Sequence, residues 1–285
     1  MISKKTLLIE NDGLLDLKAL IDAYEEIAAA QMQKVRQSVL QSREFTEGVS
    51  KIFVEVRRSY EHSLKSSKQE FSVLPHNGRT VAVFISANSG LFGDIVERTF
   101  NNFVSFVQQN PGQTDPVIVG KLGLRMLSDR KINLLYNYFD FPDDRVDYEA
   151  MNTMMRYLLQ YERILIFHGQ FRSLVYQEPV TTGVSGHDLM LRKIDAPDQK
   201  TAYLFEPSLK EVLQIFEGEI LTSIFVQSLH ESQLAKFASR MFNLDRAMGN
   251  IDTRMQKLAN LRRRVEHQII AKKQLGRLAG LSLWN

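Results

Sequence analysis

Residues 237–258 read FASRMFNLDRAMGNIDTRMQKL, and their apolar side chains recur in steps of four and three at Phe237, Met241, Leu244, Met248, Ile251, Met255 and Leu258. This spacing is typical of a helix that packs lengthwise against a second helix. The surrounding stretch, 208–283, contains no proline, and Ser208 with Glu211 three residues later predicts a capped helix start. Such a helix would be about 110 Å long at 1.5 Å per residue. It therefore needs a partner helix or a surrounding assembly.

The N-terminal stretch, about 14–64, is the candidate partner. Its small or apolar positions also alternate by four and three where the pattern is readable: Leu17, Ile21, Tyr24, Ala28, Val35, Ser42, Thr46, Val49, Phe53, Val56 and Tyr60. Asp12 or Asp16 would cap its start. We expect this helix and the last one to form a long antiparallel coiled coil.

The middle of the chain has a different pattern. Residues 80–85 (TVAVFI), 117–120 and 163–167 are short apolar runs typical of buried parallel strands, and amphipathic stretches lie at about 94–109 and 148–161. Alternating strands and helices indicate a small α/β, Rossmann-like domain inserted between the long helices. The fold class is thus α+β overall, with predicted domains 1–76, 77–200 and 201–285.

Composition excludes several classes of function. The chain has no cysteine, so it holds no disulfide, thiolate metal site or cysteine nucleophile. Its six histidines are scattered without a metal-binding spacing, and the net charge of +3 argues against a general nucleic-acid binder. No apolar run is long enough to span a bilayer, and the early Glu10 and Asp12 argue against a signal peptide.

The predicted α/β domain carries no recognisable catalytic motif. The turn at 86–93 (SANSGLFG) follows a strand, but its two glycines fit neither a dinucleotide-binding nor a P-loop pattern. Asp143-Asp144 could serve as an acid–base or magnesium pair, although their position after Pro142 favours a solvated turn. We therefore expect no catalytic residue, no metal ligand and no cofactor.

Several local patterns resemble one family. Ala238-Ser239-Arg240-Met241, with Ala247 and Asn250 beyond, resembles A-[AS]-R-M…A…N, and residues 203–208 (YLFEPS) resemble Y-x-[YF]-E-P-S. Residues 86–93 resemble [ST]-S-[DN]-x-G-L-x-G, residues 119–123 resemble V-G-x-K-G with the order shifted, and residues 27–30 resemble V-A-A-A. Lying in order along nearly the whole chain, these patterns resemble the gamma subunit family of F-type ATP synthases, of which this chain would be a divergent member.

The resemblance implies a non-catalytic central-stalk rotor. Its coiled coil would lie inside a hexamer of alpha and beta subunits and couple ATP synthesis or hydrolysis to proton or sodium transport. Hexamer contacts are expected at Asp22, Glu25, Arg240, Glu266 and Lys273. Foot contacts, to the epsilon subunit and the membrane ring, are expected at Tyr203 and Glu206. One copy per complex would lie peripherally at the cytoplasmic face of the inner membrane.

Some charged positions depart from the family pattern. Asp22, Glu25 and Gln31 stand where the family's first helix usually carries lysines. Near the other end, Glu266 and Lys273 stand where R-Q-A-x-I-T-x-E has arginine and glutamate. Two explanations compete: the reversals are exposed charges worth little each, or they match the chain to a dedicated beta subunit. We favour the second, because like-charge contacts across an interface discriminate against wrong partners. The chain would then belong to a divergent or second-copy ATPase.

The C-terminal tip, 275–284, is apolar along one side and would be held in an apolar sleeve of the hexamer. Two alternatives stay open on sequence grounds. A non-rotary coiled-coil scaffold or adaptor predicts a stable homodimer, and an α/β enzyme using the 86–93 turn predicts nucleotide binding.

Overall fold

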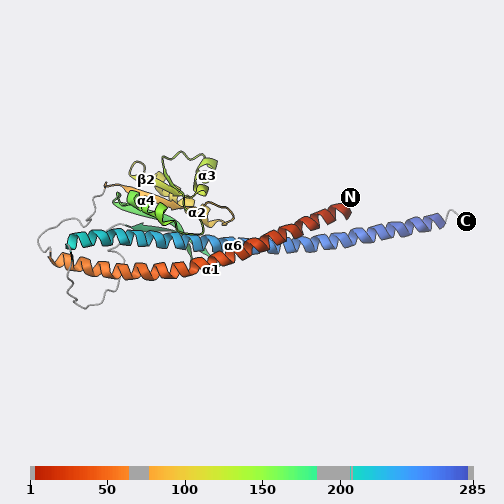
Figure 1. The fold of residues 1–285 in the computed structure, drawn as a ribbon. Coiled ribbons are helices and arrows are strands. Elements are labelled where there is room, and N and C mark those ends of the chain that lie inside the picture. Colours follow the sequence, from red (N-terminus) through yellow and green to blue (C-terminus); the bar gives the residue numbers. More distant parts are fainter. Residues whose placement is uncertain (1–3, 64–76, 185–205, 207, 282–285) are drawn as a thin grey trace. The chain divides into compact units, whose positions relative to one another are not determined.

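The computed structural model describes residues 4–63, 77–184, 206 and 208–281. The fold is α+β: along the chain, a long N-terminal helix, α1 (Lys4–Ser63), precedes a mixed sheet and a long C-terminal helix, α6 (Leu209–Leu281), follows it (Figure 1). Both predicted long helices are thus confirmed. The backbone N–H of Glu211 donates to Ser208 Oγ at 3.2 Å, so the predicted cap is also confirmed.

The predicted start of the first helix was wrong. Because α1 is already helical at Lys4, Asp12 and Asp16 lie inside it and cap nothing. Leu7, only 3% exposed, shows that the buried side of the helix extends further towards the N-terminus than the predicted start at residue 14.

The chain divides into two compact units. The first, which we call the helix-pair unit, consists of 1–28 and 241–285; the second, the sheet unit, consists of 29–240. Long helices α1 and α6 each contribute to both units. The domain boundaries predicted at 76–77 and 200–201 remain predictions.

The five-stranded sheet has the order β3-β2-β1-β4-β5. Its strands are β1 (Thr80–Ile85), β2 (Thr114–Val119), β3 (Asn137–Phe139), β4 (Arg163–Phe171) and β5 (Gln177–Val184). Strands β1 to β4 pair in parallel, and β5 pairs antiparallel with β4. The three predicted strands, near β1, β2 and β4, are confirmed, whereas the edge strands β3 and β5 were not predicted.

Helices cover both faces of the sheet, as the near-continuous apolar pattern of its central strands requires. Alternate residues of β1 belong to different cores: Phe84 packs against Phe100 and Phe103 of α2 (Ile95–Gln109), with ring centroids 5.6 and 5.4 Å away. On the other face, Val83 shares a core with Met154 of α4 (Tyr148–Leu158) and with Ile224 of α6. A further helix, α3 (Lys121–Asp129), follows β2.

Within the sheet unit, α1 and α6 lie side by side against the sheet (Figure 1). The hydroxyl of Thr46 donates to the carbonyl of Ser223 at 3.4 Å, and Arg43 pairs with Glu231, whose side chain is 2% exposed. These contacts tie the two helices together alongside the apolar core.

Within the helix-pair unit, the two helical segments run in opposite directions. Lys4 pairs with Glu266 at 3.1 Å, and Lys18, 14 residues later (18 − 4), pairs at 2.7 Å with Asp252, 14 residues earlier (266 − 252). An apolar contact line, spaced by seven residues on each helix, runs past these ion pairs and continues beyond Lys18 and Asp252. Its members are Leu7, Leu14, Ile21 and Ala28 on α1, and Leu244, Ile251 and Leu258 on α6.

Two seam positions predicted on α1 were wrong. Leu17 and Tyr24 are 43% and 39% exposed. Each residue turns a helix by about 100°, so a position three residues after Leu14 or Ile21 lies about 60° to one side of the contact line. The sequence has apolar side chains both at Leu17 and Tyr24 and at Leu14 and Ile21, so its pattern permits either pair as the contact positions. The ion pairs with α6 are consistent with the heptad that includes Leu14 and Ile21.

Candidate functional site

Side chains from distant parts of the sequence meet where β1 and β2 end, within the sheet unit. We call this set the anchor cluster; it consists of Ser86, Asn88, Ser89, Asp143, Lys236 and Arg240. It joins α6 to the turn at 86–93 and to the loop after β3. The motifs 86–93 and 238–241, singled out in the sequence, therefore touch each other in space.

Lys236 is the buried centre of the anchor cluster. Its ammonium donates to the carbonyl of Ser86 at 2.8 Å, lies 3.7 Å from the Asp143 carboxylate and sits 5.7 Å from the centre of the Phe92 ring. Its side chain is only 5% exposed. Burial lowers the pKa of Lys236, because desolvation disfavours the charged form, and the neighbouring Asp143 carboxylate partly opposes that shift.

Asp143 holds the turn from the opposite side. Its carboxylate accepts the backbone N–H of Asn88 at 2.9 Å, the N–H of Ser89 at 2.8 Å and the Ser89 hydroxyl at 2.9 Å. With a side chain 15% exposed, Asp143 is not part of the solvated turn that the sequence favoured. That expectation was wrong because the loop that follows β3 packs against the sheet edge, so Asp143 faces the turn and not water.

Arg240 lies one turn after Lys236 on α6 and binds the next part of the same turn. Its guanidinium donates to Ser89 Oγ at 3.2 Å and to the Gly90 carbonyl at 2.6 Å, and stacks 4.1 Å from the Phe92 ring centre. The adjacent Leu91 has a φ of 66°, a left-handed conformation that costs a bulky residue about 1–2 kcal/mol. The contacts of Arg240 and Asp143 help to hold this strained turn.

The turn after β2 is fixed to the same place by glycines. Gly120 has a φ of 92°, and a Cβ on it would lie 2.8 Å from the carbonyl oxygen of Ala87. The N–H of Gly123 donates to Ser86 Oγ at 3.1 Å, which in turn donates to the Val119 carbonyl at 2.6 Å. Both family-like turns are thus parts of one rigid substructure.

The anchor cluster is built for mechanical attachment. In open α/β sheets, ligands often bind outside the carboxyl ends of parallel strands. Here Lys236 and Asp143 of the chain itself lie at that edge, and the turn already holds the two cations that α6 contributes to the cluster, Lys236 and Arg240. In the described part of the chain, no three His, Asp or Glu side chains gather as metal ligands would.

The helix-pair unit presents an apolar outer surface. Beside the buried contact line of α1, several large apolar side chains are between 39% and 63% exposed: Ile9, Leu15, Leu17, Leu20, Tyr24 and Ile27. On α6, residues 267–277, beyond the Lys4–Glu266 ion pair, are all exposed, including Ile270 at 53% and Leu275 at 65%. Exposed apolar surface of this extent is typical of an interaction site.

The sequence-predicted contact residues are spread along the chain rather than gathered. Asp22 is exposed and Glu25 half-exposed on α1, and Lys273 is exposed near the end of α6. Glu266 pairs with Lys4 and with Arg262 at 3.2 Å, and these two cations hold the pKa of Glu266 below its ordinary value.

Arg240, the remaining predicted hexamer contact, belongs to the anchor cluster. Glu206 is exposed, and Tyr203 lies outside the described residues, as does residue 284 of the predicted tip. The partner contacts expected of all these side chains remain predictions.

No helix in the described ranges is both long enough and apolar enough to cross a membrane.

Comparisons with known proteins agree with this architecture. A family model described as ATP synthase matches residues 13–272. An ATP synthase gamma chain from Halothermothrix orenii is 24% identical over 276 residues, covering 92% of each chain. One from Clostridium perfringens is 22% identical and covers 91% of this chain and 94% of its own length.

Solved structures share the fold. The central stalk of the Tetrahymena thermophila mitochondrial ATP synthase, solved with its c-ring, has a TM-score of 0.61 at 18% identity, and the match covers 80% of this chain and 99% of that one. A chain of the Euglena gracilis mitochondrial enzyme has a TM-score of 0.54 at 13% identity, over 89% and 94% of the two chains. With the family model matched over 13–272 and gamma chains aligned almost end to end, this chain belongs to the ATP synthase gamma-subunit family, as a divergent member and a non-catalytic subunit of the central stalk.

Proposed function

We propose that this chain is the rotor that transmits torque between a membrane ion-conducting ring and a catalytic hexamer of alpha and beta subunits, coupling ATP synthesis or hydrolysis to proton or sodium transport. One observation carries the proposal: the antiparallel helices of the helix-pair unit bury a heptad contact line and leave an apolar outer surface and an exposed end. An isolated helix in water is marginally stable, so residues 267–277 need a surrounding partner.

The mechanism follows from differential contact. A shaft can change the nucleotide affinity of a catalytic site only if it contacts the alternative states of that site unequally. The two sides of the helix-pair unit differ in chemistry. Exposed Leu17, Leu20 and Tyr24 line one part of α1, whereas ion pairs such as Glu10–Arg254 line the junction with α6. Such an asymmetric surface would press differently on three otherwise identical sites as it turns.

In this proposal the helix-pair unit is a coiled coil and the sheet unit contains a Rossmann-like foot. Tyr203 and Glu206 would contribute to contacts of the foot with an epsilon subunit and with the membrane ring. The Tetrahymena neighbour is a central stalk solved with a c-ring, which supports the ring as a partner. One copy per complex would act as a peripheral protein at the cytoplasmic face of the inner membrane.

The anchor cluster would carry load in this rotor. Torque that enters the sheet must reach α6 without the sheet slipping along the helix. Lys236 and Arg240 attach α6 to the turn at 86–93 by directional bonds, which resist sliding better than apolar packing alone.

A rotation experiment tests the proposal directly. Because the chain has no cysteine, Leu135→Cys introduces a single thiol on a side chain that is 94% exposed in the sheet unit. A bead or fluorophore attached there, with the chain's own alpha and beta subunits fixed to a surface, should rotate in one direction when ATP is added. A label that stays still while the hexamer hydrolyses ATP would contradict a rotor. A stable homodimer without affinity for alpha and beta subunits would favour the scaffold alternative.

We further propose that the rotor is matched to its own hexamer, because Asp22, Glu25, Glu266 and Lys273 reverse or remove charges expected of the family. ATP hydrolysis should be coupled to rotation with the cognate alpha and beta subunits and poorly coupled with a hexamer from an ordinary ATP synthase. Equal coupling with both would remove the idea of a dedicated partner and leave the rotor proposal intact.

A further inference from the structure

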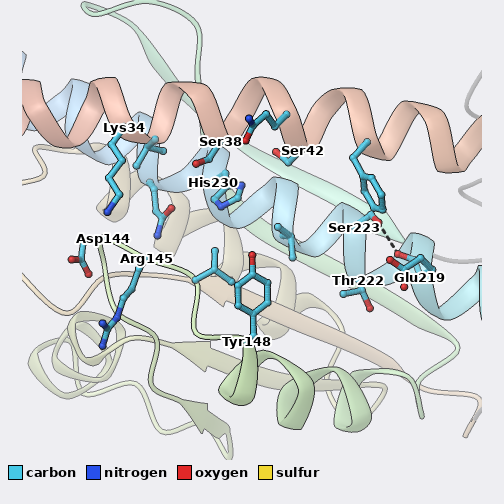
Figure 2. A pocket seen from close by; sticks show the side chains of 16 residues that line it. Lys34, Ser38, Ser42, Asp144, Arg145, Tyr148, Glu219, Thr222, Ser223 and His230 are labelled. Atoms are coloured by element: carbon cyan, nitrogen blue, oxygen red, sulfur yellow. Dashed lines mark hydrogen bonds between the residues drawn. The ribbon is translucent and has the colours of Figure 1, made fainter.

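A pocket of about 510 Å³ lies within the sheet unit, between α1, α6 and the segment that leads into α4 (Figure 2). Lys34, Ser38 and Ser42 of α1 face His230 of α6 across it, and Asp144, Arg145 and Tyr148 lie along its other side. Its size is that of ordinary small-molecule sites, which span about 300–1,000 Å³. The pocket is separate from the anchor cluster and from the helix-pair unit.

Two buried polar atoms of the lining have no hydrogen-bond partner among the described residues. They are the side-chain amide nitrogen of Gln233, a residue 1% exposed, and Nδ1 of His230. A buried amide N–H without an acceptor is rare in folded proteins, because it has lost its water without a replacement. Gln233 therefore calls for an acceptor oxygen at its end of the pocket. Burial lowers the pKa of His230, so its ring is neutral and adds no charge.

The charges of the lining lie mostly at one end. Lys34, Arg145 and Asp144 lie together there, whereas Glu219 lies at the opposite end (Figure 2). Two cations and one carboxylate give that end a formal charge of +1 (2 − 1). Neither Lys34 nor Arg145 forms an ion pair within the described residues, unlike Lys236 or Arg43. The end near Lys34 therefore favours an anion.

The rest of the lining mixes hydroxyl and amide side chains with apolar and aromatic ones. Val35 and Val226 form part of the wall, and Phe45 and Tyr148, which also line the pocket, are 54% and 71% exposed. Aromatic faces of this kind stack on flat ring systems with offset or tilted geometry. A ligand that fits must therefore combine an anionic group with a planar apolar body.

We propose that this pocket binds a small aromatic anion, whose charged oxygen accepts from Gln233 and pairs with Lys34 while its ring lies against Tyr148. The inference does not rest on the rotor proposal, because all its contacts belong to the sheet unit of the isolated chain. It assigns this unit a binding function besides the attachments that the anchor cluster makes.

Calorimetric titration of the full chain with 1-naphthoate, an aromatic carboxylate, tests the proposal. Saturable binding is expected, and 1-naphthamide, its neutral analogue, should bind about tenfold more weakly, since one charge-assisted hydrogen bond is lost. Lys34→Gln should weaken naphthoate binding about tenfold and leave naphthamide binding unchanged. Lys34 is exposed, so this variant keeps the fold.

Arg36→Gln is the matched control, because it removes one positive charge from the exposed surface of the same helix outside the pocket lining. Its affinity for naphthoate should stay within about twofold of the parent chain. Gln233→Met removes the buried amide at similar volume and should weaken naphthoate binding. Equal affinity for naphthoate and naphthamide, equal loss in both charge variants, or no saturable binding up to about 1 mM would overturn the proposal.

Discussion

Lys236 shows how a single buried charge can fix the register between a helix and a sheet. An unpaired ammonium in an apolar interior is strongly disfavoured, so it holds α6 where the Ser86 carbonyl and the Asp143 carboxylate can reach it. Lys236→Met keeps the volume and removes the charge. We expect it to lower the free energy of unfolding by about 3 kcal/mol, because Asp143 is left buried without its cation.

Urea denaturation of the variant measures this loss. Lys121→Met is the control, since Lys121 pairs with Asp140 at 3.3 Å but is 58% exposed, and its loss should cost less than about 1 kcal/mol. Asp143→Asn combined with Lys236→Met should cost less than the sum of the two single changes. Strict additivity would mean that the two side chains do not stabilise each other.

His168 should make the sheet unit sensitive to acid. Burial of the whole ring lowers its pKa from 6.5 to about 4. Its Nδ1–H donates to the Gly169 carbonyl at 3.1 Å, and its Nε2 accepts from the Thr182 hydroxyl at 2.9 Å, a pair of bonds that the neutral ring satisfies. Between these pH values the unfolded chain binds a proton at His168 that the folded chain does not. The contribution of His168 to the free energy of unfolding is therefore full above pH 6.5 and is lost as the pH falls towards 4.

The size of this effect is about 3 kcal/mol for a shift of this extent. His168→Gln should remove most of that slope from the free energy of unfolding measured between these two pH values. His267→Gln, at an exposed position of α6, should leave the slope unchanged. If the free energy of unfolding of His168→Gln changed with pH as it does in the parent chain, other groups would be responsible for the acid sensitivity.

At the residue scale, the sequence could predict the motifs but not the contact between them in the folded chain. The 86–93 turn and the 238–241 motif were recognisable, yet nothing in a linear pattern says that Arg240 reaches Gly90. One signal was present: Lys236 stands between Ala235 and Phe237 on the buried side of α6, where a charge requires a buried partner. Asp143 gave no such signal, since an aspartate after a proline is usually solvated.

At the scale of single elements, apolar patterns predicted the long helices and the central strands. They did not predict β3, which has only three residues, two of them exposed, or β5, whose partly buried pattern includes Thr181, Thr182 and Gly183. Edge strands bury little, so their sequences carry a weak signal. Within the helix-pair unit, two of the four predicted α1 positions, Leu17 and Tyr24, were wrong, because large and mainly apolar side chains stand there as well as at the true contacts Leu14 and Ile21.

The contact line of the helix-pair unit gives a prediction that separates packing from partner binding. Ile21→Ala should lower the free energy of unfolding by about 2–4 kcal/mol, because the side chain is 7% exposed and packs in a core with Leu244 and Ile251. Leu20→Ala, at 53% exposure, should change it by less than about 0.5 kcal/mol. Leu20→Ala should instead weaken binding to the alpha–beta hexamer, which a pull-down with cognate subunits measures. The seam assignment would be wrong if both changes destabilised the chain equally.

A pair of glycines tests the turn after β2 in the same way. A Cβ at Gly123 would lie 2.7 Å from Cγ2 of Ile118 and 3.1 Å from Ser86 Oγ, so Gly123→Ala should destabilise the chain by about 1–3 kcal/mol. Gly48, inside α1, has no atom within 4 Å of the same position, and Gly48→Ala should stabilise the chain by about 0.5–1 kcal/mol. Thermal unfolding of both variants gives the comparison, and a neutral Gly123→Ala would mean that the turn tolerates a wider approach.

At the scale of the whole molecule, the chain combines a unit that packs through apolar surface with a unit that is held by a buried ion pair. The helix-pair unit offers exposed apolar and charged side chains to a partner, and the sheet unit fixes α6 to a rigid α/β structure. These two kinds of surface suit the proposed rotor, which would contact a catalytic hexamer and a membrane ring. The sequence could predict the long helices and the separate α/β region, because hydrophobic periodicity is the primary signal of secondary structure in a sequence.

Partner choice is the property of the whole molecule that the charged surface should decide. Glu266→Arg with Lys273→Glu restores the family-like order of charges near the end of α6. We expect the double variant to couple ATP hydrolysis to rotation better with an ordinary hexamer and worse with its own, because like charges across an interface discriminate against a partner. The cost in stability should be small, since Glu266 and its partners Lys4 and Arg262 are substantially exposed.

Glu266→Arg with Lys272→Glu is the matched control: it has the same net charge but reverses a neighbouring lysine that faces about 100° away around the helix. It should not improve coupling to the ordinary hexamer. The difference between the two double variants should also shrink at high salt, where exposed charges are screened within about 3 Å at 1 M. If both double variants shift coupling equally, or if the shift persists at high salt, net charge or packing rather than matched contacts would govern the choice of hexamer, and the charge reversals of this divergent rotor would carry no specificity.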